Sequence, residues 1–256
     1  RNSLFYVSLF SMRHLTATLC LTVAVLLGSA GMSSSTEPVK DFCLAGTKHS
    51  HSPVSGQCSD AYESGNYTTA LREWEPLAKN GNSSAQFNLG QIHRKGQGVP
   101  QDDKTAVKWY TLAAEQGLAS AQTSLGWMYR EGQGVPQDDK TAVKWYTLAA
   151  EQGFAHAQSN LGTMYQFGQG DDKTAVKWYS LAAEQGFANA QTKLGFMYLL
   201  GQGVPQDDKT AVKWYTLAAE QGYAHAQHRL GLMYSMGDGV PQDDKTAVKW
   251  YTLAAE

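Results

Sequence analysis

The feature that most constrains this chain is a segment that recurs almost without change. An alanine that heads each copy, Ala85 in the first, returns after steps of 36, 36, 33 and 36 residues. The short step arises because Gly170 runs directly into Asp171, where other copies insert Val-Pro-Gln. Repetition at this period is typical of solenoids, in which similar units stack on one another. The repeated segment, DDKTAVKWYTLAAEQG, begins at Asp102, Asp138, Asp171, Asp207 and Asp243.

Each copy reads as two helices joined by a loop. In the second copy the first helix is expected over about 120–131, followed by a loop over 132–137 with two glycines and a proline. Asp138 is a natural N-cap for the second helix, and Asp139 suits the positive end of its dipole. Gly153 is expected to end that helix, because glycine adopts the left-handed conformation of a C-terminal cap.

Apolar residues follow one face of each predicted helix, so each helix pair must bury its face against the next pair. A glycine in the middle of the first helix, Gly126 in the second copy, costs about 1 kcal/mol relative to alanine. Its recurrence predicts a close approach between helices. The predicted buried stripes are Ala142, Trp145, Tyr146, Ala149 and Ala150 on the second helix, and Ala121, Leu125, Met128 and Tyr129 on the first.

These motifs resemble the Sel1-like repeat, a relative of the tetratricopeptide repeat. The copies carry Leu-Gly-x-Met-Tyr, then Gly-x-Gly-Val-Pro-x-Asp, then Ala-x-x-Trp-Tyr-x-x-Ala-Ala-x-x-Gly; Ile92-His93 and the third loop depart from this pattern. The resemblance covers about 59–256. It implies an all-α fold, an α/α solenoid forming a right-handed superhelix of antiparallel helix pairs. It also implies a role as an adaptor or scaffold, with the first helices lining a concave groove.

The first thirty residues are expected to contain a secretory signal peptide. Translation is predicted to start at Met12, followed by an apolar run from Leu15 to Leu27 and cleavage near Ala30, with residues 1–11 as read-through. A membrane anchor is the alternative, but the run is shorter than the ~20 residues that a spanning helix needs. The mature protein is therefore expected to be exported, periplasmic or secreted, without a membrane span.

Residues 31–58 are predicted to form a flexible arm that contains the cysteines Cys43 and Cys58. A disulfide between them is expected in an exported protein. Two alternatives to the disulfide remain: a zinc site that the cysteines form with His49 and His51, or two free thiols. Residues 59–82 are interpreted as a degenerate capping repeat, and 83–256 as five repeats, the last cut short at Glu256.

Composition and motifs argue against several other functions. A formal net charge of −2 gives no electrostatic case for binding nucleic acid or an anionic membrane. His225 and His228 could share a metal, but two ligands alone are a weak signal. The sequence predicts no catalytic residue, metal or cofactor. The resemblance suggests one alternative function, that of a secreted Sel1 repeat protein that binds penicillin, acts like a β-lactamase or binds the cell wall.

Differences between copies are confined to one face of the first helix. The variable columns span an arc of about 120°, whereas the second helix hardly changes. One explanation is drift on a solvated face, and the other is a recognition surface. The six variable columns are represented in the second copy by Ser120, Thr123, Ser124, Trp127, Arg130 and Glu131.

A recognition surface there would have a basic, aromatic end and an apolar end. Such a groove suits a protein or peptide ligand, either extended or an amphipathic helix. The column of Leu200 could instead pack under its own loop. The predicted function is a non-catalytic scaffold, with no prediction of oligomeric state. The groove residues are predicted to be Arg94, Lys95, Trp127, Arg130, Phe167, Phe196, Leu200, Leu232 and Met236.

Overall fold

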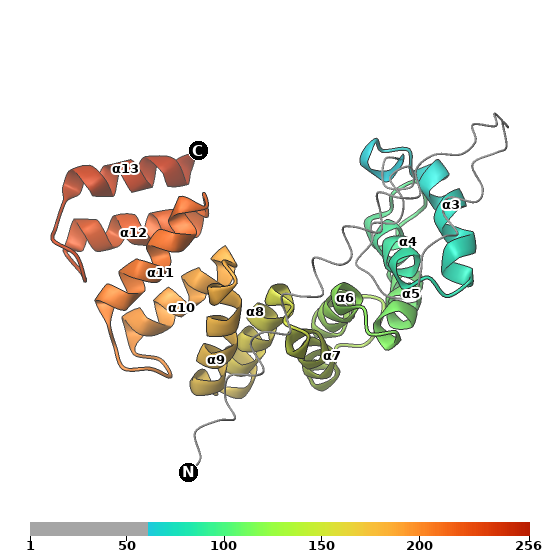
Figure 1. Ribbon diagram of the computed structural model, residues 1–256, viewed down its shortest axis with the longest axis horizontal. Helices are drawn as coiled ribbons and strands as arrows, with labels where there is room; N and C mark the ends of the chain where they lie inside the picture. The colour runs from blue at the N-terminus through green and yellow to red at the C-terminus, as the bar shows by residue number, and fades with distance from the viewer. Residues whose placement is uncertain (1–60) are drawn as a thin grey trace, which may run out of the picture. The chain divides into compact units, whose positions relative to one another are not determined.

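A computed structural model describes residues 61–256, which contain helices and turns but no strand. The predicted signal peptide, the arm and the pairing of Cys43 with Cys58 lie outside the described residues. The helices follow one another in space in the order in which they occur along the chain, each packed on the next (Figure 1). This is the expected all-α repeat solenoid.

Each repeat contributes a first helix and a second helix, named here the A helix and the B helix. The A helices are α4 (Ser83–Lys95), α6 (Ala119–Glu131), α8 (Ala155–Thr163) with its π-helical continuation η1 (Met164–Gln169), α10 (Ala188–Leu200) and α12 (Ala224–Met236). The B helices are α5 (Asp103–Glu115), α7 (Asp139–Glu151), α9 (Asp172–Glu184), α11 (Asp208–Glu220) and α13 (Asp244–Ala255). Before them, α3 (Tyr67–Lys79) continues through Pro76 and packs on α4.

The B helices begin and end as their sequence predicts. Asp138 caps α7, because its Oδ1 accepts the backbone N–H groups of Lys140 at 3.0 Å and Thr141 at 3.2 Å. The Thr141 hydroxyl also donates to Asp138 Oδ2 at 2.7 Å. The α7 helix ends at Glu151, and Gly153 follows with a φ of +85°. The same acidic cap opens every B helix of the five repeats.

The buried stripe is mostly the predicted one, with one correction on each helix. Tyr146 is fully buried, whereas its neighbour Trp145 is only half-buried and packs on the rim of the core. On the A helix Tyr129 is likewise half-buried, while Leu125 and Met128 are fully buried. Trp145 and Tyr146 flank the same stripe, and the tyrosine is the one inserted between the helices.

The glycine in the middle of each A helix makes room for that tyrosine. A Cβ added to Gly162 would lie 2.7 Å from Cδ1 and Cε1 of Tyr179, and one added to Gly90 would lie 2.6 Å from the same atoms of Tyr110. Real Cβ contacts are not this short, so the A and B helices could not pack this closely with a side chain there. The predicted close approach is confirmed.

A buried glutamine, not foreseen from the sequence, joins consecutive repeats. Gln122 is 4% exposed, and its Nε2 donates to the backbone oxygen of Ala114 in the preceding repeat at 3.1 Å. Its Oε1 accepts from Gln152 Nε2 at 2.7 Å, at the end of its own repeat. The corresponding bonds recur in the neighbouring repeats, so a polar seam runs along the stack.

The loops also join neighbouring repeats, except in the third repeat. Gly134 and Gly203 press on the backbone of Asp103 and Asp172, at the start of the preceding B helix. In the third repeat Gly170 has no atom within 4 Å of an added Cβ. The A helix there ends in η1, because the lost Val-Pro-Gln leaves too little chain for the usual loop.

Candidate functional site

The variable columns of the A helices line three pockets. The Phe196 pocket, of about 230 Å³, receives Phe167 from η1, Lys193 and Phe196 from α10, and Arg229 from α12. The Trp127 pocket, of about 270 Å³, is lined by residues that all come from variable columns. Variation between repeats therefore falls where the surface is hollowed, which favours a recognition surface over drift on a uniform solvated face. The residues lining the Trp127 pocket are Arg94, Thr123, Ser124, Trp127 and Asn160.

Cations in these pockets lie over aromatic rings of the neighbouring helix. The Arg94 guanidinium carbon is 5.3 Å from the ring centre of Trp127, and that of Arg229 is 5.4 Å from the ring centre of Phe196. Stacking of this kind holds a guanidinium in place while its N–H groups stay available to a ligand. Lys193 Nζ lies 5.6 Å from the ring centre of Tyr179.

Tyrosine hydroxyls from the B helices reach the floor of this face. Tyr215 lines the Phe196 pocket, and its hydroxyl is buried without a hydrogen-bond partner among the described residues. Tyr179 instead donates to Gln166 Oε1 at 3.0 Å. Burial raises the pKa of Tyr215 to about 12, so this hydroxyl stays protonated and can donate. An unpaired buried donor costs about 1–3 kcal/mol, which a ligand oxygen would recover.

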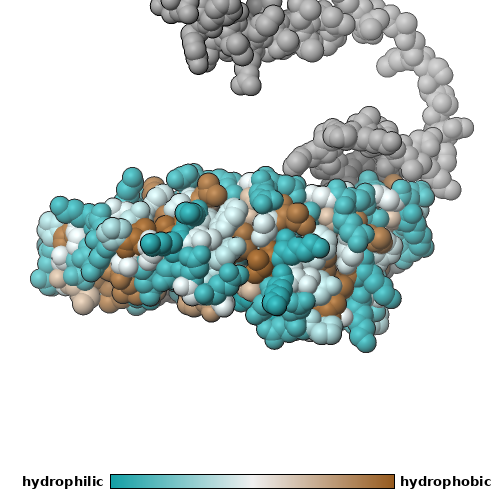
Figure 2. Space-filling model, turned by 90° about the horizontal axis from the view of Figure 1, so that it is seen from below, coloured by the Kyte–Doolittle hydropathy of each residue, from teal (hydrophilic) through white to brown (hydrophobic). Residues whose placement is uncertain are grey.

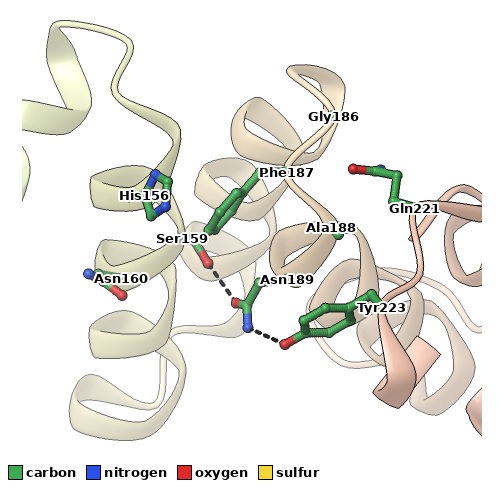
Figure 3. Close-up of a pocket in the computed structure, with 9 residues that line it drawn as sticks. All are labelled: His156, Ser159, Asn160, Gly186, Phe187, Ala188, Asn189, Gln221 and Tyr223. Carbon is green, nitrogen blue, oxygen red and sulfur yellow. Dashed lines mark hydrogen bonds between the residues drawn. The ribbon is translucent and has the colours of Figure 1, made fainter. Parts of the chain in front are cut away.

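The third pocket, the Asn189 pocket, lies near the N-terminal ends of the same helices. It has a volume of about 450 Å³. Ser159 of α8 donates its hydroxyl to Asn189 Oδ1 at 3.1 Å, and Asn189 Nδ2 donates to the hydroxyl of Tyr223 at 2.8 Å (Figure 3). His156 lies beside Phe187, with ring centres 4.4 Å apart. These polar groups already satisfy one another, so the pocket offers fewer unpaired donors than the Phe196 pocket.

The structure brings together only part of the predicted groove. Phe167 and Phe196 share one pocket, and Arg94 and Trp127 share another. Arg130 pairs with Glu131 at 3.1 Å, and Lys95 donates to the hydroxyl of Tyr62 at 3.2 Å; neither cation is among the residues that line these two pockets.

Apolar residues of the predicted groove that line none of these pockets sit at or near the helix ends. Leu200 and Met236 are 51% and 66% exposed, so neither packs under its own loop, and Leu232 is half-buried. Phe167 is more exposed still, at 74%. Figure 2 shows one face of the molecule, where apolar patches are separated by polar side chains. On that face the apolar surface is divided into separate patches.

Sequence reasoning missed the two cations of the Phe196 pocket. Lys193 and Arg229 occupy the variable column that contains Ser124 in the second repeat. Because the column was described by this small serine, its two cations in later repeats were overlooked. A comparison of charge along each column would have found them. His225 lines this pocket, whereas His228 lies beside Tyr251. Among residues 61–256 no group of three or more His, Cys, Asp or Glu side chains is placed to hold a metal ion.

Within the same range, no helix combines the length and apolar character that crossing a bilayer requires. A family model described as Sel1 repeat matches residues 83–118, 119–154, 155–187, 188–223 and 224–256. The chain belongs to the Sel1 repeat family. Sel1 repeats commonly serve as scaffolds for protein interactions. A comparison with curated proteins gave no match.

Solved structures of Sel1 repeat proteins have the same fold. A Sel1 repeat protein from Oxalobacter formigenes is 36% identical, with a TM-score of 0.73 over 78% of this chain and 80% of that one. A protective antigen of uropathogenic Escherichia coli is 37% identical, with a TM-score of 0.69 over 78% of this chain but only 48% of that one. An immunity protein from Pseudomonas aeruginosa, 21% identical over 80% of this chain and 83% of its own, shares the fold with a TM-score of 0.56.

Proposed function

We propose that this Sel1 repeat chain is a non-catalytic scaffold whose A-helix face binds a segment of a partner protein. One observation carries the proposal: the residues that differ between otherwise near-identical repeats line the pockets of that face. Drift would scatter such differences over any solvated surface. The B helices, which carry exposed positions of their own, hardly vary.

The half-buried aromatic residues supply most of the expected binding energy. Trp127 and Phe196 each pack on the core with one side and face a pocket with the other. Such anchored aromatic residues dominate protein interfaces, because they bury a large area and lose little conformational freedom. Phe167, in the Phe196 pocket, and Leu200, four residues after Phe196 on α10, are both exposed and enlarge the contact.

Capture from an extract of the host tests this role. Immobilised wild-type protein is expected to retain a partner that the double variant Phe196→Ser, Leu200→Ser does not retain. Leu181→Ser, Leu217→Ser is the matched control, because both leucines are exposed on B helices, at 45% and 38%. Circular dichroism checks that each variant is folded. Equal retention by wild type and both variants would contradict the proposal.

Export of the scaffold is part of the proposal, supported by the apolar run from Leu15 to Leu27. N-terminal sequencing of protein isolated from the host is expected to find a mature start near Gly31. A start at Met12 would contradict export by this route. No observation on the described residues favours the penicillin-binding or β-lactamase-like alternative, and hydrolysis of nitrocefin by the purified protein would revive it.

A further inference from the structure

Charge is segregated between the two helices of each repeat. The A helices together carry five Lys and Arg residues against a single Glu, in a chain whose net charge is −2. That Glu131 is already paired with Arg130. Each B helix opens with an acidic cap and a second Asp, so the excess acid lies on the other helix layer. The A-helix face is thus basic, although the chain as a whole is slightly acidic.

Lys193 and Arg229 concentrate this charge in the Phe196 pocket. They occupy the same column of consecutive A helices, and neither has a carboxylate within 4.0 Å among residues 61–256. Arg229 is held over Phe196 by stacking, which leaves its N–H groups unused. Burial and the nearby Arg130 guanidinium lower the pKa of Lys193, so its charge is poorly solvated and would be stabilised by an anion.

The floor of the same pocket adds a neutral donor beside an apolar wall. The buried hydroxyl of Tyr215 has no hydrogen-bond partner among residues 61–256, and the charge of Arg229 opposes the rise in its pKa that burial causes. Phe167 and Phe196 supply apolar surface next to the two cations. A carboxylate adjacent to an apolar side chain matches this set, because two cations and a hydroxyl accept an anion while the rings accept the side chain.

We propose that the occupant of the Phe196 pocket is an acidic protein segment that places an Asp or Glu between Lys193 and Arg229 and an apolar side chain against Phe196. This inference rests on the proposed function. A pocket of about 230 Å³, bounded by two rings, fits side chains better than the backbone of a nucleic acid.

Fluorescence anisotropy with a labelled peptide of Glu and Ser around one central Phe tests the charge preference. We expect the wild type to bind this peptide about ten-fold more tightly than the same peptide with Gln for Glu, since two ion pairs at a part-buried site contribute about that much. Added salt should reduce the difference. Equal binding of both peptides, or no binding of the acidic one, would overturn the proposal.

Variants with matched charge identify the site. Lys193→Gln, Arg229→Gln is expected to lose the preference for the acidic peptide. Lys177→Gln, Lys213→Gln removes two exposed B-helix charges and should keep it. An equal loss in both variants would mean that only net charge matters, which refutes the assignment. Equally tight competition by an oligothymidylate of the same charge would refute a peptide occupant.

Failure here is distinguishable from failure of the scaffold function. If Phe196→Ser, Leu200→Ser loses a captured host partner while Lys193→Gln, Arg229→Gln retains it fully, the groove binds a partner but the acidic occupant is wrong. If the charge variant also loses the partner, and circular dichroism shows it folded, both proposals gain support.

Discussion

A contact between a glycine and a tyrosine ring sets how closely the helices of each repeat can pack. Gly162 faces Tyr179, whose hydroxyl is fixed by Gln166, so the ring has little freedom to move aside. Gly168 lies in the same helical unit, with no atom within 4 Å of an added Cβ and no positive φ. These two glycines are a matched pair, because only one of them is required by packing.

Alanine at the two positions should change stability in opposite directions. Gly162→Ala is expected to destabilise the protein, because overpacking of about 1–3 kcal/mol outweighs a gain in helix propensity of about 1 kcal/mol. Gly168→Ala should be neutral or stabilising by up to ~1 kcal/mol. Urea denaturation measures both, and destabilisation of similar size at both positions would show that the ring contact is not the cause.

The acidic caps predict how stability depends on pH. Hydrogen bonds from the Thr141 hydroxyl and its backbone N–H hold the pKa of Asp138 below the ordinary value of an aspartate, and the other four caps share this direction. Because the pKa is lower in the folded state, the ionised caps stabilise the fold above an unfolded pKa of about 3.9. This contribution is lost as pH falls through the folded pKa.

A variant with all five caps changed to Asn isolates the effect, since Asn is also a good N-cap and the variant should fold. The free energy of unfolding of the wild type should exceed that of the variant at pH 6, and the difference should shrink below about pH 4. Urea titrations at several pH values measure it. If the difference in free energy of unfolding between wild type and variant did not change with pH, the pKa values of the caps would not differ between the folded and unfolded states.

At the scale of helices, the glutamine side chains of the polar seam hydrogen-bond each B helix to the A helices beside it. Gln122→Ala removes its bonds with the backbone oxygen of Ala114, which keeps the N–H of Gly117 as a donor, and with Gln152. Two hydrogen bonds of about 0.5–1.5 kcal/mol each should then cost about 1–3 kcal/mol. The exposed loop residue Gln133 is the control, and its change to Ala should stay within about 0.5 kcal/mol. Combining Gln122→Ala with Gln152→Ala should cost less than the sum of the single changes, by at least ~0.5 kcal/mol. Full additivity would mean that the two side chains are not coupled.

Much of each element could be predicted from sequence because the signals are local. Asp138 and Gly153 set the ends of α7 through their own backbone chemistry. Periodicity could not decide that Tyr146 rather than Trp145 is fully buried, because adjacent residues share the edge of a stripe and only the facing glycine selects one. The role of Gln122 was missed for a related reason. A buried glutamine can be explained only by its hydrogen-bond partners, which lie on other helices and are not indicated by the sequence.

The candidate site was less predictable than the fold. Comparison of the repeats singled out a face on which Phe167, Phe196, Arg94 and Trp127 line pockets. It could not tell which members of a column meet, because a pocket forms between helices of consecutive repeats. The π-helical end of the third A helix likewise depends on how a shortened chain closes, which the missing Val-Pro-Gln does not specify.

For the whole stack, we expect the junction between the second and third repeats to be the least stable, because it lacks a loop contact that the other junctions make. Loops of the neighbouring repeats press on the preceding B helix, as Gly203 does on Asp172. The third repeat makes no such contact through Gly170, and Asp139 at the start of α7 is exposed, whereas Asp103 and Asp172 are half-buried. A solenoid unfolds cooperatively only as far as its nearest-neighbour interfaces allow, so this junction should separate two partly independent units.

Inserting Val-Pro-Gln between Gly170 and Asp171 should therefore restore coupling across the stack. We expect urea unfolding of the wild type to be broad, with amides of α7 and η1 exchanging faster than their counterparts in α11 and α12. The insertion should sharpen the transition and slow that exchange, because an added loop contact and a valine that is half-buried in the other loops stabilise the junction by roughly 1–2 kcal/mol. Insertion of Gly-Ser-Gly lengthens the chain equally without the valine and should give little of this gain. If both insertions act alike, chain length rather than loop packing limits the junction.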